Sequence, residues 1–191
     1  MSVPIESLIG IAIGIGLAAA TGFRVFLPFL IAGLAARWGV LQLSDGFAWL
    51  SSTGALVALG TASIVEVAAY YVPGVDHVLD LLAGPVAVAA GVVASASVMA
   101  DIPPYILWPV AIIGGGGVAG LTKATNAVVR AKAGLTTAGF ANPVVSTGET
   151  AGAVGMALAA IVVPVVCLIA VFAVMLWLGR RALRFMAPAR G

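Results

Sequence analysis

Two charged residues stand alone inside apolar stretches of this sequence and are the first candidates for chemistry. Arg24 is the only charge between Leu8 and Ala36, and Glu66 lies in the middle of the apolar stretch 52–72. A charge at the centre of a membrane helix costs about 2.5–3.5 kcal/mol on insertion scales, so it is normally paired or placed in a wet cavity. We therefore expect Arg24 and Glu66 to pair, either as a proton- or substrate-linked pair or as a structural ion pair that locks the bundle.

Three polar residues further along the chain share one helix face. Lys123, Asn126 and Arg130 have the i, i+3 and i+7 spacing that places side chains on one side of a helix. One interpretation is a basic wall that binds a small anion or a lipid phosphate. The other is an amphipathic helix whose long cationic side chains snorkel to the headgroup layer. The spacing leaves both interpretations open.

The most polar motif of the chain covers residues 139–149 and brings Asn142, Ser146, Thr147 and Glu149 close together. Ser146 or Thr147 is expected to cap the start of the last helix, with Glu149 in its first turn. The alternative is that this helix start and Asn142 contact a ligand. The candidate binding residues are then Arg24, Glu66, Lys123, Asn126, Arg130, Asn142 and Glu149.

Enzyme chemistry is not expected from this sequence. His77 is the only histidine and Cys167 the only cysteine, so neither a histidine-based metal site nor an internal disulfide is predicted. The four glycines at 114–117 lack the Gly-Lys-Ser/Thr of a phosphate-binding loop, and no nucleophile–base set stands out. We expect no catalytic residues, no metal and no cofactor.

The composition places the chain in a membrane. Hydrophobic residues make up 62% of the 191 residues and charged residues only 8%, against about 25% charged in soluble domains. A soluble fold could not cover its surface with so few charges. The net charge of +2 comes from too few basic residues for a nucleic-acid surface, so we expect no nucleic-acid partner.

The long apolar runs predict an all-α, polytopic bundle that forms a single membrane domain, 1–191. About 20 apolar residues make a span. The regions expected to cross or enter the membrane are 8–36, 52–72, 79–100, 105–121 with the semi-polar stretch 122–135, and 150–178. The first is interrupted at Thr21–Arg24 and at Pro28. The four tryptophans, at 38, 49, 108 and 177, fall near the ends of these segments, as an interfacial aromatic belt requires.

An internal repeat relates residues 14–39 to residues 115–140 at an offset of 101, through matched glycines, alanines and threonines. The repeat predicts two halves, 1–101 and 102–191. Their arrangement is inverted, which we favour, if each broken unit crosses the membrane once, and parallel if each broken unit is re-entrant. The repeat also predicts a second break, at Thr122–Asn126, that faces the first across a polar cavity at similar depth. Small residues at four-residue spacing in both copies favour close helix packing, within the chain or in a homodimer.

The charge distribution predicts the orientation. Arg180, Arg181 and Arg184 follow the last apolar segment and form a dense basic cluster. By the positive-inside rule, we expect a multi-pass protein of the cell (inner) membrane with a cytoplasmic C-terminus.

Two motifs carry a family resemblance: residues 16–29, GLAAATGFRVFLPF, and residues 140–149, FANPVVSTGE. With these motifs the chain resembles a bacterial family of small multi-pass membrane proteins that is catalogued as a domain of unknown function and numbered 4126. The resemblance extends over roughly residues 8–178. It implies a membrane protein and brings no activity with it.

The function that these features favour is a small transporter or translocase for an anionic solute or a lipid headgroup, with membrane lipids as its surroundings and partners. A channel-like pore is an alternative, and it would need a continuous polar path. A non-catalytic scaffold, in which the charges form structural pairs, is a third possibility. The direction in which Arg24 and Glu66 point separates these alternatives.

Overall fold

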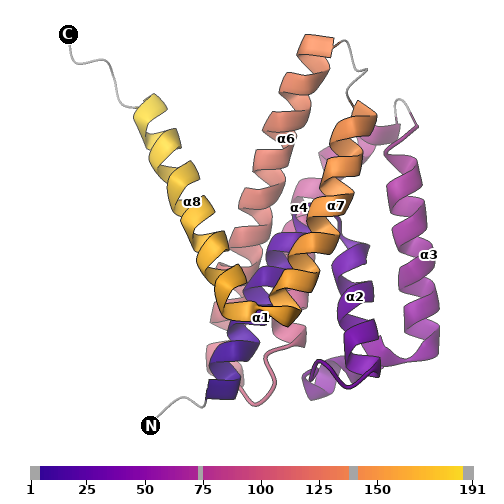
Figure 1. Ribbon diagram of the computed structural model, residues 1–191, viewed down its shortest axis with the longest axis vertical. Coiled ribbons are helices and arrows are strands. Elements are labelled where there is room, and N and C mark those ends of the chain that lie inside the picture. The colour runs from indigo at the N-terminus through magenta and orange to yellow at the C-terminus, as the bar shows by residue number, and fades with distance from the viewer. Residues whose placement is uncertain (1–4, 73–74, 138–141, 187–191) are drawn as a thin grey trace.

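The computed structural model describes residues 5–72, 75–137 and 142–186, and the secondary structure of these ranges is entirely helical (Figure 1). The helices form the apolar bundle of a membrane protein. In chain order they are α1 (Ile5–Thr21), α2 (Phe26–Arg37), the 3₁₀ turn η1 (Asp45–Ser51), α3 (Thr53–Ala69), α4 (Val75–Ser97), α5 (Pro104–Pro109), the π-helical segment η2 (Val110–Gly116), α6 (Gly117–Thr137), α7 (Asn142–Val162) and α8 (Pro164–Met186).

The first apolar stretch folds into a hairpin of two short helices. α1 has 17 residues and α2 has 12, so neither reaches the length of about 20 residues that a span needs. Both helices lie in the lower part of Figure 1, and their junction, residues 22–25, falls near the middle of the long axis. The break expected at Thr21–Arg24 is confirmed. We call residues 22–25 the hairpin tip.

The second half of the chain differs from the expectation. Residues from Pro104 to Thr137 form one helical segment, and α6 runs without interruption through Thr122–Asn126. The predicted second break is therefore wrong. Glycines 114–116 lie in the π-helical segment η2, and Gly117 follows it directly. A Cβ on Gly115 would lie 2.6 Å from the Cβ of Ser95 on α4. Here glycine permits close packing of α4 and does not end the helix.

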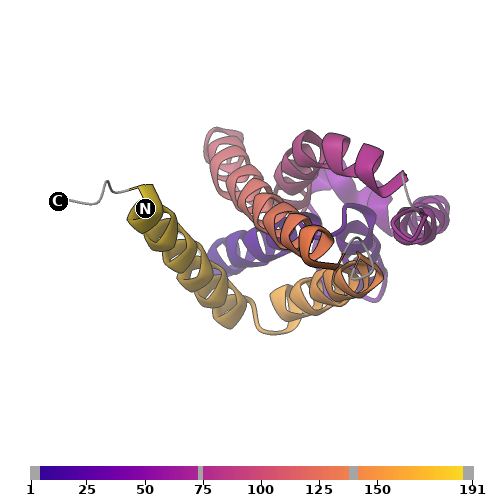
Figure 2. The ribbon, with the colours of Figure 1, turned by 90° about the horizontal axis from the view of Figure 1, so that it is seen from above.

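The last apolar stretch is two helices and not one. α7 starts at Asn142, earlier than the expected start near residue 150, and it ends before Val163. Pro164, which has no N–H and disfavours a helical residue before it, begins α8. In Figures 1 and 2, α8 leans away from the other helices toward the C-terminus.

Three helical segments of the described chain are long and apolar enough to cross a membrane: Pro104–Thr137, Asn142–Val162 and Pro164–Arg181. The bent pair η1 and α3, which meet at 69°, raises this number to four if it counts as one span. α1, α2 and the apolar part of α4 are shorter. The expected total of about five segments and the internal repeat stay predictions.

α1 is the central helix of the bundle (Figure 2) and packs against α4, α7, α8 and α6. Its small residues allow these approaches. A Cβ on Gly14 would lie 2.9 Å from the carbonyl oxygen of Ser95 on α4, and one on Gly16 would lie 2.6 Å from Ala160 on α7. The small-residue faces of α1 are thus buried against α4 and α7 within the same chain. A homodimer would need other surfaces.

Candidate functional site

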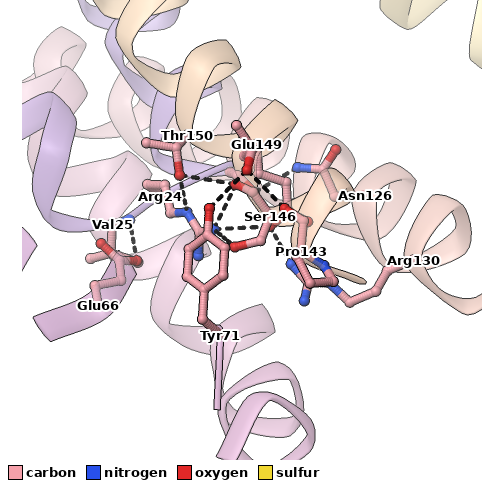
Figure 3. Close-up of polar contacts among 12 residues, drawn as sticks. Arg24, Val25, Glu66, Tyr71, Asn126, Arg130, Pro143, Ser146, Glu149 and Thr150 are labelled. Carbon is pink, nitrogen blue, oxygen red and sulfur yellow. Dashed lines mark hydrogen bonds and ion pairs between the residues drawn. The ribbon is translucent and has the colours of Figure 1, made fainter. Parts of the chain in front are cut away.

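Arg24 at the hairpin tip is completely buried and points at α7 (Figure 3). Its Nη2 donates to the carbonyl oxygen of Ser146 at 3.0 Å and to the Oγ of the same residue at 2.6 Å. Its Nε donates to Oγ1 of Thr150 at 3.2 Å. These contacts anchor the tip to one helical turn of α7. The guanidinium is thereby held inside the bundle, away from lipid.

Glu149 is the counter-ion of this region. Its carboxylate lies 3.5 Å from Nη2 of Arg24 and also accepts a hydrogen bond from Arg130 on α6. The side chains of Glu149 and Arg130 are 5% and 8% exposed, so both charges are buried. One carboxylate therefore bridges two cations that belong to the hairpin tip and to α6. Such a pairing is needed to offset the desolvation of buried charges.

Tyr70, at the end of α3, is packed among cations. Its ring centroid lies 4.2 Å from Cζ of Arg24, 4.7 Å from Cζ of Arg130 and 5.6 Å from Nζ of Lys123. All these distances fall within the range of about 6 Å at which an aromatic ring attracts a cation. Tyr70 is 6% exposed. The ring thus completes a buried cluster, which we call the cation cluster: Arg24, Tyr70, Lys123, Arg130 and Glu149.

Glu66 does not form the predicted ion pair with Arg24. Its two carboxylate oxygens accept hydrogen bonds from the backbone N–H groups of Val25 and Phe26, at 2.8 and 3.1 Å. Glu66 therefore caps the start of α2 from the neighbouring helix α3, because Val25, the N-cap residue, makes no side-chain cap of its own. In the view of Figure 3, Glu66 and Arg130 lie on opposite sides of Arg24.

The backbone N–H groups of the hairpin tip are not free to bind an anion. The N–H groups of Gly22, Phe23 and Arg24 donate to carbonyl oxygens of α1, and the next two are bound by Glu66. Any anion bound at the tip must therefore be held by side chains, chiefly Arg24.

Glu66 is expected to stabilise the hairpin as a cap. Replacing Glu66 with alanine leaves two N–H groups of α2 without their acceptor and should lower the free energy of unfolding by about 1–2 kcal/mol. Glutamine keeps one carbonyl oxygen and should cost less. Denaturant unfolding in detergent micelles measures both variants. Equal stability of the wild type and the alanine variant would contradict this role.

The polar face of α6 lies inside the bundle. Lys123, Asn126 and Arg130 are 7%, 9% and 7% exposed, which disfavours snorkelling to the headgroup layer. Nδ2 of Asn126 donates to the carbonyl oxygen of Gly22 at 3.3 Å. Residues 22 and 122 touch, since a Cβ on Gly22 would lie 2.5 Å from the Cβ of Thr122. The two stretches predicted to face each other do so, but in direct contact and without a break in the second.

Glu149 belongs to the site and Asn142 is the first residue of α7, one turn before Ser146, so the predicted cap is wrong. α7 begins at Asn142, so Ser146 and Thr147 lie in its second turn and Glu149 lies further along. Ser146 uses its hydroxyl and its carbonyl oxygen to accept from Arg24. Cap residues and helix-interior residues share the same side-chain chemistry, so the motif did not reveal the start of the helix.

Three residues of the site were not predicted as binding residues: Tyr70, Ser146 and Thr150. Tyr70 shares the i, i+3, i+7 face of Ser63 and Glu66, and Ser63 and Tyr70 are both buried. That shared face was the available signal for Tyr70. The contacts of Ser146 and Thr150 with Arg24 join residues more than 120 positions apart, and no local sequence pattern predicts them.

Two cavities adjoin this region. One of about 500 Å³ lies between the end of α3 and α7, and Thr150, a partner of Arg24, is part of its wall. The other, of about 360 Å³, lies between the hairpin tip, α3 and α4, with Glu66 and Tyr70 in its wall. Both walls are mainly apolar. Within the described ranges, no group of three or more histidine, cysteine, aspartate or glutamate side chains could hold a metal ion.

Comparison with known protein families gives a match over most of the chain. A family model described as "Domain of unknown function (DUF4126)" matches residues 11–184, which include the whole cation cluster. No curated protein and no solved structure matches the chain.

Proposed function

We propose that this chain, which belongs to the DUF4126 family, is a membrane translocator that moves an anionic solute or an anionic lipid headgroup without changing it chemically. The single observation that carries the proposal is Arg24. A fully buried guanidinium sits at the hairpin tip, inside an apolar bundle of membrane-protein character. An ionisable residue at such a place marks a substrate or ion pathway by default.

The geometry around Arg24 supports an anion and not a cation as the cargo. Arg24, Arg130 and Lys123 surround one tyrosine ring, and Nη1 of Arg24 donates to no acceptor in the described part of the chain. Guanidinium groups bind phosphate and carboxylate oxygens in pairs, through parallel N–H donors. A phosphate or carboxylate is therefore the ligand chemistry that this site suits.

Glu149 suggests how binding and release are balanced. It bridges Arg24 and Arg130 in this structure, while its Oε1 accepts no hydrogen bond from the described residues. An incoming anion would displace this carboxylate from the guanidinium groups, and Glu149 would return when the anion leaves. The buried cations would then have a counter-charge throughout the cycle, which limits the desolvation cost.

The distribution of charge supports an inner-membrane protein with a cytoplasmic C-terminus. Exposed Arg180 and Arg181 lie near the end of α8, and Lys132 lies near the end of α6. Figure 1 places these two helix ends at the same end of the bundle, opposite the end of α2 with Arg37. Under the positive-inside rule, the end with more basic residues faces the cytoplasm.

The proposal is tested by reconstituting the protein into liposomes and measuring uptake of inorganic phosphate and leaflet exchange of fluorescent phosphatidylglycerol. Arg24→Gln should reduce the active readout by about ten- to a hundredfold, because a charge-assisted contact worth about 1.5–3 kcal/mol is lost. Arg37→Gln is the matched control, since Arg37 is exposed and bonds only Thr53 among the described residues.

A scaffold is the second candidate, and one observation favours it. The guanidinium of Arg24 already has three partners within the chain: Ser146, Glu149 and Thr150. In that case the cation cluster is a structural lock. The wild-type protein would then move neither probe, and Arg24→Gln would change only the stability. A channel is not supported by the mainly apolar walls of the cavities.

A further inference from the structure

The cavity between α3 and α7 has two kinds of wall. Val67 on α3 and Ala151, Val154 and Gly155 on α7 are apolar or lack a side chain. We call this cavity, with its volume of about 500 Å³, the α3–α7 groove. Its size lies within the range of small-molecule sites, about 300–1,000 Å³.

Hydroxyl groups form the remaining wall of the groove. Thr147, Thr150 and Tyr71 contribute them, and the hydroxyls of Tyr71 and Thr147 are hydrogen-bonded across the groove at 2.8 Å. Thr150 also accepts from Nε of Arg24, so the guanidinium lies directly behind the hydroxyl wall. The groove thus has an apolar part and a polar part, and the polar part adjoins a buried cation.

The groove continues into surfaces that face lipid. Ile64, one turn before Val67 on α3, is 72% exposed, and Leu158, one turn after Val154 on α7, is 49% exposed. Exposed apolar side chains of a membrane bundle contact acyl chains. A ligand that comes from the bilayer therefore reaches the groove sideways, without leaving the apolar phase.

From these observations we infer that the α3–α7 groove is a lateral binding site for a membrane phospholipid, whose acyl chain lies on Val67, Val154 and Gly155 and whose phosphate is drawn to Arg24. This inference rests on the proposed function and names its substrate class. Two features select a lipid over free phosphate. Inorganic phosphate gains nothing from an apolar wall, whereas each buried methylene of an acyl chain adds to the affinity.

Charge complementarity favours a headgroup at the Thr150 end of the groove, because Thr150 is the lining residue that contacts Arg24. Arg24 is fully buried, and its Nη1 has no acceptor in the part of the chain that the structure describes. The hydroxyl of Tyr71 provides a further donor at the rim once its hydrogen bond to Thr147 opens, whereas Thr147 donates to the carbonyl oxygen of Pro143. A phosphodiester with one negative charge and two free oxygens matches this set.

Gly155 allows the groove to be filled without a clash. A Cβ at this position has no heavy atom within 4 Å, so Gly155→Leu places its side chain in the groove. Gly117→Leu is the matched control, because Gly117 is an exposed glycine of α6 that also has nothing within 4 Å and lines neither cavity of the site. Both changes replace glycine by leucine in a helix.

The experiment measures leaflet exchange of fluorescent phosphatidylglycerol and uptake of inorganic phosphate by proteoliposomes of each variant. Gly155→Leu should lower lipid exchange at least about tenfold, and Gly117→Leu should keep it within about twofold of the wild type. Unchanged exchange in Gly155→Leu overturns the groove assignment. Val67→Trp fills the groove from the opposite wall and replaces Gly155→Leu if the latter does not fold.

The two probes separate failure of this inference from failure of the proposed function. Arg24-dependent uptake of phosphate without lipid exchange overturns the lipid assignment and leaves anion translocation standing. Movement of neither probe by the folded wild-type protein overturns both. Lipid exchange that requires Arg24 and an open groove supports both.

Discussion

Replacing Glu149 with glutamine is expected to lower the free energy of unfolding by about 3–5 kcal/mol, the cost of leaving a buried charge without its partner. Glu149 is 5% exposed and contacts both Arg24 and Arg130. Glutamine keeps the shape but loses the charge that offsets the desolvation of two guanidinium groups. Denaturant unfolding in detergent micelles measures the loss. Glu6→Gln, an exposed residue of α1, is the control and should change little.

The same variant distinguishes a translocation site from a structural lock. If an anion takes the place of Glu149 during the cycle, added phosphatidylglycerol should restore part of the lost stability, because binding to the folded state stabilises it. Phosphatidylcholine, which has no net charge, should restore less. A structural lock predicts no difference between the two lipids. Full stability of Glu149→Gln without any lipid would contradict the role of Glu149 as a counter-ion.

The sequence predicted the hairpin tip well because local signals agree there. Gly22 weakens the helix, and the charge of Arg24 interrupts the apolar run. The glycine also has a tertiary reason, since any Cβ there would collide with Thr122. Where a helix breaker and an isolated charge coincide, the sequence is sufficient to place a break.

The second break was not predictable because polar residues can mark a face as well as an end. Lys123, Asn126 and Arg130 have helical spacing and are all buried, so α6 continues and turns its polar face inward. The spacing of these residues correctly predicted one polar face of α6. The inferred repeat then predicted a break at Thr122–Asn126 that α6 does not have. Only the packing of α6 against the tip, through Asn126 and Gly22, decides between the two.

The membership of the cation cluster was partly predictable and the pairing was not. The sequence singled out Arg24 as an isolated charge, Lys123 and Arg130 by their shared helix face, and Glu149 as part of the polar motif. The structure brings all four together. The carboxylate that meets Arg24 is Glu149, 125 positions away, and not Glu66, because Glu66 is used by the backbone at the start of α2. Desolvation requires a partner for each buried charge but does not say which one.

Arg24 and Glu149 are expected to be energetically coupled, although Nη2 and the carboxylate are 3.5 Å apart. Arg24→Met alone should cost less than Glu149→Gln alone, because Glu149 keeps Arg130 as its partner when Arg24 is removed. The hydroxyl of Thr150 also keeps its hydrogen bond to the carbonyl oxygen of Ser146, so few buried groups lose every partner. A loss of about 1–3 kcal/mol is expected for Arg24→Met.

The double variant Arg24→Met/Glu149→Gln should then be more stable than the sum of the single losses predicts, by about 0.5–3 kcal/mol. In Glu149→Gln two guanidinium groups are left buried around Tyr70 without the shared carboxylate. Removing Arg24 as well leaves fewer uncompensated charges, and methionine fills the same apolar space. The measurement is a double-mutant cycle of unfolding free energies in one detergent. Strict additivity would show that Arg130 alone pairs with Glu149. Arg24 would then be held in position by Ser146, Thr150 and Tyr70. An anion that binds Arg24 would not have to displace Glu149.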